Sequence, residues 1–157
     1  MALTTRTRYA LRALIDISRH DGDGPVRAAD IAERQQLSAG YLERILLQLV
    51  ESGLVQSRKG PGGGYLLNRP AADISLAEAI AAGGEELFTV PCVCEEASEE
   101  CSLEHDCPAH PVWAGLRRAT QDYLEGQSLA DIAGRDSRAG TTVINGLRPL
   151  RSAADHK

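Results

Sequence analysis

Residues 28–67 read AADIAERQQLSAGYLERILLQLVESGLVQSRKGPGGGYLL and predict, in order, a helix, a tight turn, a second helix and a hairpin. Ser38 stands where an N-cap is expected, and Gly53 where the second helix ends. Ile31 is the main apolar anchor of the first helix, over residues 28–36. Apolar residues of the second recur at i, i+3, i+4, i+7 and i+8: Leu42, Ile45, Leu46, Leu49 and Val50. Two short helices joined by a tight turn predict a helix-turn-helix.

Two short apolar strands, residues 54–57 and 65–67, flank a basic, glycine-rich loop at residues 58–64. This arrangement predicts a β-hairpin, here called the wing, beside the helix-turn-helix. A phosphate-binding P-loop is excluded, because no Gly-Lys-Ser/Thr ending follows and the loop leads into a strand. Arg58 and Lys59 at the hairpin tip suit a contact with DNA phosphate or with the minor groove.

Further helices are predicted on both sides of this module. Thr4 or Thr5 caps a helix that runs to about residue 20, and Ser75 caps one over residues 76–82. Pro111 suits the first residue of a long helix to about residue 125, and residues 128–133 form a last capped turn. The predicted fold class is mainly α with a small β-hairpin, a winged helix-turn-helix DNA-binding domain plus a long dimerisation helix.

The long helix is expected to pair two copies of the chain. Its apolar side chains follow one face: Trp113, Leu116, Thr120, Tyr123 and Leu124. Core packing within one chain is the alternative, although a helix beyond the cysteine loop has little else to pack on. A homodimer would read two half-sites about one DNA turn apart.

Composition limits the class of protein. The chain has 157 residues, of which 43% are hydrophobic, 25% charged and only 4% aromatic, so its core is mostly aliphatic and favours helices. No stretch is apolar and long enough to span a membrane, and the N-terminus carries arginines where a signal peptide needs an apolar segment. A cytoplasmic protein with no membrane partner is expected.

Charge divides the chain into parts. Residues 1–70 hold ten Arg or Lys against seven acids, whereas residues 71–110 hold ten acids and no Arg or Lys. All four cysteines lie in the acidic part, which in a reducing compartment favours metal binding over disulfides. We therefore predict a winged helix-turn-helix domain at 1–83, a cysteine-bearing cluster-binding loop at 84–110, a dimerisation helix with a terminal turn at 111–134 and a disordered tail at 135–157.

The basic first part predicts a contact with double-stranded DNA. Recognition helices present their N-terminal residues to base edges, and small residues there allow close approach. Glu43 either accepts from a base donor or is a solvated charge paired with Arg44 or Ser57. A helical domain without a nucleic-acid role is the alternative. The candidate DNA-binding residues are Arg8, Ser38, Ala39, Gly40, Tyr41, Glu43, Arg44, Arg58, Lys59, Gly60 and Gly62.

The cysteines follow the pattern Cys92-x-Cys94-x6-Cys101-x5-Cys107-x2-His110. Thiolates repeated at this density in an acidic loop are typical of a metal or iron–sulfur site. His110 is preferred to His105 as the imidazole ligand, because it closes a Cys-x-x-His at a helix start. Zinc and a thiol–disulfide switch are alternatives. An enzyme is not expected, because no base–nucleophile pair accompanies the cysteines.

With these pieces assembled, the sequence resembles the iron–sulfur regulators of the Rrf2 family, the group of IscR-like and NsrR-like transcription regulators. The resemblance covers about residues 1–133, and the Gly-Pro-Gly-Gly-Gly-Tyr wing is its most specific motif. The matching stretches are Leu3-Thr4, Arg8-Tyr9-Ala10, Pro25-Val26, Asp30-Ile31, Glu33-Arg34-Gln35, Leu37-Ser38, Tyr41-Leu42-Glu43, Gly53-Leu54-Val55 and residues 60–67.

The resemblance implies a dimeric DNA-binding regulator whose DNA affinity changes with the state of a 2Fe–2S cluster, through iron, redox or nitric-oxide status. Carried over by position, Cys101, Cys107 and His110 match the last three ligands. Cys94 is the expected first ligand and Cys92 the alternative. The family has five residues between its first two cysteine ligands, and Cys94 leaves six before Cys101. Relatives with a 4Fe–4S cluster take an acidic ligand from the first helix, where this chain has Arg8.

Overall fold

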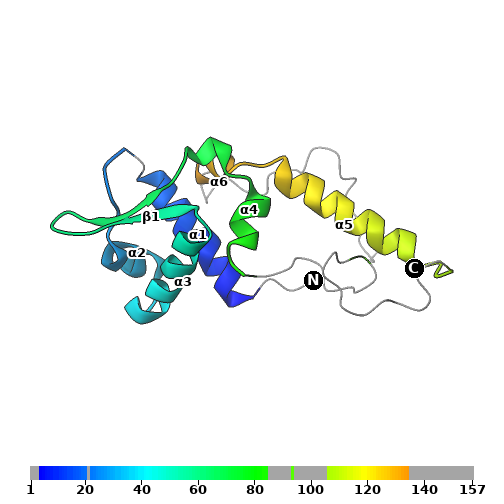
Figure 1. Cartoon of the computed structure of the whole chain (residues 1–157), viewed down its shortest axis with the longest axis horizontal. Coiled ribbons are helices and arrows are strands. Elements are labelled where there is room, and N and C mark those ends of the chain that lie inside the picture. Colours follow the sequence, from blue (N-terminus) through cyan, green and yellow to red (C-terminus); the bar gives the residue numbers. More distant parts are fainter. Residues whose placement is uncertain (1–3, 21, 85–92, 94–105, 135–157) are drawn as a thin grey trace, which may run out of the picture.

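A computed structural model describes residues 4–20, 22–84, 93 and 106–134 (Figure 1). The predicted tail and most of the cysteine-bearing loop therefore lie outside the described residues. The described part is mainly α with one two-stranded antiparallel hairpin, as the sequence predicted. Its elements are α1 (Thr5–Arg19), α2 (Ala28–Gln35), α3 (Ala39–Glu51), β1 (Val55–Arg58), β2 (Gly64–Leu67), η1 (Ala71–Asp73), α4 (Leu76–Ala81), α5 (His110–Glu125) and α6 (Leu129–Ala133).

Three helix starts are capped by the residues that the sequence singled out. The Thr4 hydroxyl accepts from the first turn of α1. Ser75 and Ser128 each form a reciprocal capping box, with Glu78 and Asp131 respectively. The hydrogen bond from the backbone of Ser75, with help from a nearby arginine, lowers the pKa of Glu78, so this carboxylate stays ionised and keeps its cap.

Some helix ends differ from the prediction. Ser38 occupies the N-cap position of α3, but its side chain makes no capping hydrogen bond. Helix α2 ends at Gln35 instead of residue 36, because the backbone of Gln36 turns into the left-handed region. Helix α5 begins at His110, one residue before Pro111, and a proline in the first turn needs no intrahelical donor.

Gln36, the residue that ends α2, has φ 55° and ψ 45°, a conformation that favours glycine. Its amide donates to Glu33 O at 3.1 Å, and the next amide, of Leu37, donates to Ala32 O at 2.9 Å. We expect Gln36→Gly to raise the free energy of unfolding by about 0.5–1 kcal/mol, because it removes the Cβ strain. Urea denaturation measures this change. The control Gln36→Ala should bring no gain, and a Gly variant no more stable than the wild type would contradict the assignment.

One aliphatic core joins α1, α2, α3, the base of the hairpin and α6. Leu129 of α6 is fully buried in this core, and Arg19 of α1 donates to the α6 carbonyl of Ala133 at 2.9 Å. The short helix after α5 therefore packs back onto α1. Fully or almost fully buried members of the core are Ala10, Ala13, Leu14, Ile17, Ile31, Leu42, Ile45, Leu46, Leu49, Val55, Ile74, Ala79 and Leu129.

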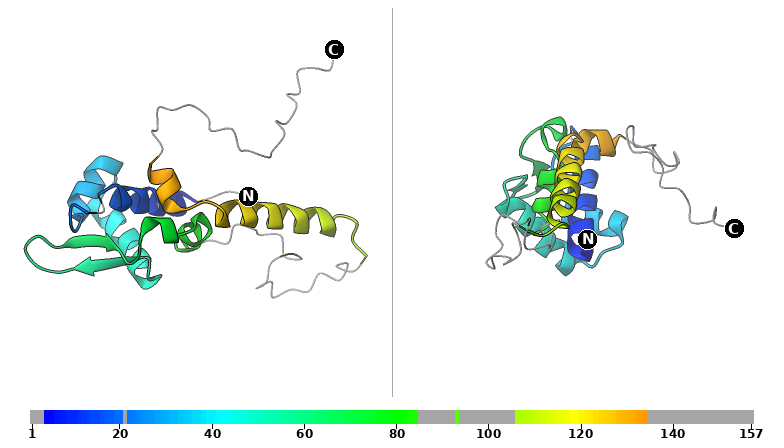
Figure 2. Two further views of the ribbon diagram at one scale, coloured as in Figure 1. Left: turned by 90° about the horizontal axis from the view of Figure 1, so that it is seen from above. Right: turned by 90° about the vertical axis from the view of Figure 1, so that its right-hand side faces the viewer.

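Helix α5 projects from the rest of the molecule, at the end opposite to the hairpin (Figures 1 and 2). Leu124 is buried against Leu76 and Ile80 of α4, so it does not belong to the exposed apolar face for which it was predicted. The other apolar side chains, Val112, Trp113, Leu116 and Tyr123, are 39–63% exposed. Within the described ranges, no helix combines the length and apolar character that crossing a membrane requires.

Candidate nucleic-acid interface and metal-ligand segment

Helix α3 has one buried and one exposed face. The buried face carries the predicted apolar stripe, in which Leu42, Leu46 and Leu49 have no exposed surface. The opposite face follows helical spacing and is exposed along its whole length: Gly40, Glu43, Arg44, Leu47 and Glu51. A helix of this kind is fixed by its core side and leaves the other side free to enter a groove.

The start of α3 has little side-chain bulk. Ser38, Ala39 and Gly40 are all exposed, and the Ser38 hydroxyl caps no amide of the helix. A Cβ built on Gly40 would meet no atom within 4 Å, so packing inside the chain does not require glycine there. The first turn therefore offers backbone and a hydroxyl to a molecule that approaches closely.

Tyr41, one of the predicted DNA-binding residues and expected to be exposed in that role, is half-buried. Its ring meets the ring of Tyr9 edge-on, with centroids 6.0 Å apart and planes at 86°. Glu43 and Arg44 are exposed as expected. In the part of the chain that the structure describes, no ion pair or hydrogen bond joins Glu43 to Arg44 or Ser57.

The wing projects beyond α2 and α3 as the outermost part of this end of the molecule (Figure 2). At its base Val55 pairs with Leu67, and both side chains are buried. At its tip Arg58 pairs with Gly64, and Arg58 and Lys59 are exposed, as are Gly60 and Gly62 in the loop. The basic pair is thus held at the end of a paired hairpin and faces solvent.

Close backbone approach explains two of the wing glycines. A Cβ on Gly63 would lie 2.2 Å from the carbonyl oxygen of Arg58, and one on Gly64 would lie 2.5 Å from that of Val26. The Gly64 contact exists because Val26 and Tyr65 exchange two backbone hydrogen bonds, of 2.8 and 2.9 Å. The glycine run therefore lets a third segment pack against the hairpin.

Arg8 lies on the exposed side of α1, where its Nη2 donates to Thr5 Oγ1 at 3.1 Å. Within the described ranges no hydrogen bond or ion pair joins Arg8 to α3 or the wing, so it stands apart from the candidate DNA-binding residues at the α3 start and at the wing tip.

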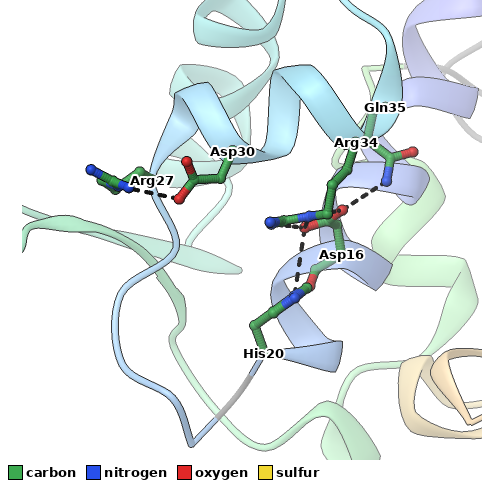
Figure 3. Close-up of polar contacts among 6 residues, drawn as sticks. All are labelled: Asp16, His20, Arg27, Asp30, Arg34 and Gln35. Carbon is green, nitrogen blue, oxygen red and sulfur yellow. Dashed lines mark hydrogen bonds and ion pairs between the residues drawn. The ribbon is translucent and has the colours of Figure 1, made fainter.

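Sequence reasoning missed a polar cluster between α1 and α2 (Figure 3). Asp16 is buried, and Arg34 holds its carboxylate with hydrogen bonds of 2.6, 3.0 and 3.1 Å. Gln35 donates to the same carboxylate at 2.8 Å, and the Nδ1 atom of His20 lies 2.8 Å from the Asp16 carbonyl oxygen. The bond to Asp16 raises the pKa of Arg34, which therefore stays charged. An acid among apolar residues 13, 14 and 17 was the available signal.

Two of the four expected metal ligands lie in the described residues. Cys107 is half-buried and forms no disulfide, and His110 begins α5. The His110 amide donates to the Cys107 carbonyl at 3.1 Å, so one tight turn separates the two residues. Cys94, Cys101 and the alternative Cys92 lie outside the described ranges, within which no group of three or more metal-ligating side chains occurs.

Comparison with known proteins identifies this combination of helix-turn-helix, wing and projecting helix. Residues 3–135 match Rrf2, described as an iron-dependent transcriptional regulator. The chain belongs to the Rrf2 family. It is therefore a DNA-binding transcription regulator with a winged helix-turn-helix and not an enzyme, and the resemblance found in the sequence is confirmed.

Rrf2 proteins of known sequence and structure cover most of the chain. The transcriptional regulator IscR of Photorhabdus laumondii is 37% identical over 95% of this chain and 100% of its own. The structure of T. potens IscR matches with a TM-score of 0.66 and 31% identity, over 84% and 85% of the two chains. That of CymR, the global cysteine regulator of B. subtilis, matches with a TM-score of 0.70 and 29% identity, over 85% and 96%.

Proposed function

We propose that this Rrf2-family regulator reads an operator with the first turn of α3 and the wing, as a homodimer in the cytoplasm. The observation that carries the proposal is the exposed, low-bulk start of α3 together with an exposed basic hairpin tip at the same end of the molecule. Residues 38–41, with Glu43 and Arg44, meet base edges in the major groove, and Arg58 and Lys59 meet phosphate. Gly60 and Gly62 let the loop approach the backbone, and Arg8 adds a separate positive charge.

Replacing Arg58 and Lys59 together with Ala should weaken DNA binding and flatten its dependence on salt. Each phosphate contact adds about 0.9 to the slope of log K against log salt, and a dimer has two wings, so the slope should fall by about 3–4. Affinity at moderate salt should fall at least about tenfold. Fluorescence anisotropy over a salt series measures both.

Arg118→Ala is the matched control for the wing variant, because Arg118 is an exposed arginine on α5, far from the wing. It should leave the slope unchanged. An unchanged slope in the wing variant itself would remove the wing from the interface.

Helix α5 is the proposed dimer contact. Val112 and Leu116 lie four residues apart, and Leu116 and Tyr123 seven. These exposed apolar side chains form one face of a helix that projects from the body. Exposed apolar surface of this kind marks an interface between proteins. Pairing two copies along α5 would also set the separation of the two reading heads.

Leu116→Glu should raise the dimer dissociation constant at least about thirtyfold, because it places a charge in the centre of an apolar contact. Sedimentation equilibrium measures the constant. Arg118→Glu, about half a helical turn away, is the control and should leave the protein dimeric. If the Leu116→Glu protein stayed dimeric at concentrations at which the wild type is dimeric, this face of α5 would be excluded as the dimer contact.

The cysteine segment is the proposed sensor, with a 2Fe–2S cluster held by Cys94, Cys101, Cys107 and His110, and Cys92 as the alternative first ligand. Three thiolates and an imidazole suit such a cluster, as they also suit zinc. Cys107 and His110 fit this role, because they lie one turn apart and Cys107 forms no disulfide. A bound cluster would supply a redox-active group that is lost or altered by oxidation or nitric oxide.

Signal and DNA are connected through α5, which begins with the ligand His110 and ends against α4 of the winged-helix core. The chain after α5 continues into α6, whose Leu129 is buried in that core. A change at the ligand end of α5 can therefore alter how the two reading heads are spaced. Such coupling requires that the two states of the segment differ in free energy between DNA-competent and incompetent dimers.

The proposed cofactor is tested by anaerobic purification followed by a visible absorption spectrum and counts of iron and acid-labile sulfide. We expect red-brown protein with about equal iron and sulfide, as a 2Fe–2S cluster requires. Colourless protein that contains zinc, or no metal, would contradict the cluster and assign sensing to zinc or to the thiols.

A further inference from the structure

Arg12 of α1 holds the end of α2. Its Nε donates to Gln35 Oε1 at 2.9 Å, and its Nη2 donates to the Gln35 carbonyl oxygen at 3.2 Å. Gln35 is the last residue of α2, where carbonyl groups lack partners within the helix and a cation is favourable. Arg12 thus fastens the C-terminus of α2 to α1 from the solvent side.

The same guanidinium also connects with the start of α3. Its central carbon lies 5.3 Å from the centroid of the Tyr9 ring, which is a cation–π distance. The Tyr9 ring in turn meets Tyr41 edge-on, with centroids 6.0 Å apart. Because Tyr41 lies in the first turn of α3, Arg12 and Tyr9 connect the last residue of α2 with the first turn of the recognition helix.

The α2 end of this connection is anchored in the protein interior. The Gln35 amide donates to Asp16, whose buried carboxylate is also bound by Arg34. Figure 3 shows Gln35 and Arg34 converging on Asp16 from α2. The turn itself, residues 36–38, is short and begins with Gln36 in a left-handed conformation. Side chains of α1 therefore brace a turn that is strained at its first residue.

We propose that Arg12 is a positioning residue for DNA recognition, which acts through Tyr9 to fix the first turn of α3 relative to α2. This inference rests on the proposed DNA-reading role of that turn. Arg12 needs no contact with DNA for this role, since its guanidinium is occupied by Gln35 and Tyr9. A shift of the first turn alters base contacts, whereas contacts to phosphate from the wing remain.

The test uses Arg12→Lys, which keeps the positive charge but loses the two-pronged hydrogen bonds and the planar group over Tyr9. The probes are the duplex that the wild-type protein enriches from a random-sequence pool and a scrambled duplex of equal length and composition. The Arg12→Lys variant should bind the enriched duplex about tenfold more weakly, the size of one base contact. Its affinity for the scrambled duplex and its salt slope should not change.

Two Tyr9 variants separate positioning from folding. Tyr9→Leu removes the ring and should reproduce the loss of discrimination, and adding it to Arg12→Lys should cause no further loss. Tyr9→Phe keeps the ring and should bind as the wild type does. Circular dichroism below the unfolding transition confirms that each variant is folded.

Four results would overturn the proposal. An Arg12→Lys variant that discriminates the two duplexes as well as the wild type would exclude a positioning role. Equal losses of affinity for both duplexes, with a smaller salt slope, would also exclude it, because they indicate a phosphate contact. A Tyr9→Phe loss as large as that of Tyr9→Leu would assign the effect to the hydroxyl. Wild-type protein that fails to discriminate the duplexes would contradict the proposed interface, and this inference with it.

Discussion

Replacing Asp16 with Ala is expected to lower the free energy of unfolding by about 2–4 kcal/mol, a large share of the stability of a small domain. The carboxylate is buried and accepts hydrogen bonds from Arg34 and Gln35, so its loss leaves these donors without their acceptor. The lower part of the range reflects the Arg34 side chain, which is 37% exposed and can turn partly towards water.

Urea denaturation followed by circular dichroism measures the Asp16 effect. Asp30→Ala is the control, because its ion pair with Arg27 lies on the surface and should contribute less than about 1 kcal/mol. The loss of unfolding free energy in Asp16→Asn should lie between the losses in Asp16→Ala and Asp30→Ala, since the amide keeps the shape of the carboxylate and one acceptor oxygen. A loss in Asp16→Ala no larger than in Asp30→Ala would contradict the structural role of this cluster.

Replacing Cys107 with Ala is expected to abolish cluster binding and with it the response of DNA binding to oxidation. Cys107 is the one proposed thiolate ligand within the described residues, and it lies three residues before the proposed ligand His110, the first residue of α5. A 2Fe–2S cluster takes four protein ligands, and alanine offers no donor atom in place of the thiolate. Because Cys107 is only half-buried, the substitution should leave the fold intact.

Iron and sulfide counts, together with DNA affinity before and after oxidation, measure the Cys107 effect. Cys92→Ala is the matched control and should keep its iron and the response of its DNA binding to oxidation, whereas Cys94→Ala should lose both. The reverse pattern would make Cys92 the first ligand. A Cys107→Ala protein with wild-type iron and an unchanged response would rule out the proposed sensor.

Elements set by neighbouring residues could be predicted from the sequence. The apolar stripe of α3, the serine caps at Ser75 and Ser128 and the hairpin around its glycine run are local patterns, and each is present. Gln36 shows where local rules end. Its left-handed backbone favours glycine, yet the chain has glutamine there, directly after Gln35, which Arg12 of α1 holds at the end of α2.

Contacts between distant parts of the chain could not be predicted. Asp16 meets residues 18 and 19 positions away, and Leu129 is buried next to a backbone bridge between Ser75 and Ser128. Periodicity reports which side of a helix is apolar but not which element covers it. For this reason Leu124 was grouped with Trp113 and Tyr123, although it packs on α4 and they remain exposed.

The same limit applies to the candidate site. Ser38, Gly40, Arg44, Arg58 and Lys59 lie exposed on α3 and the wing, as their sequence positions suggested. The half-burial of Tyr41 arises from Tyr9, thirty-two residues earlier, which no local pattern reveals. The roles of these residues in DNA binding stay proposals, as does the ligand set of the cysteine segment.

The most direct test of the sensing proposal compares the DNA affinity of one protein sample with and without its cluster. The duplex is the one that the anaerobically purified protein enriches from a random pool, and the cluster is removed by oxidation and chelation with iron counted before and after. We predict that affinity changes at least about fivefold, the lower end of typical coupling between two sites. Equal affinities of the two forms, at full and zero iron content, would contradict it.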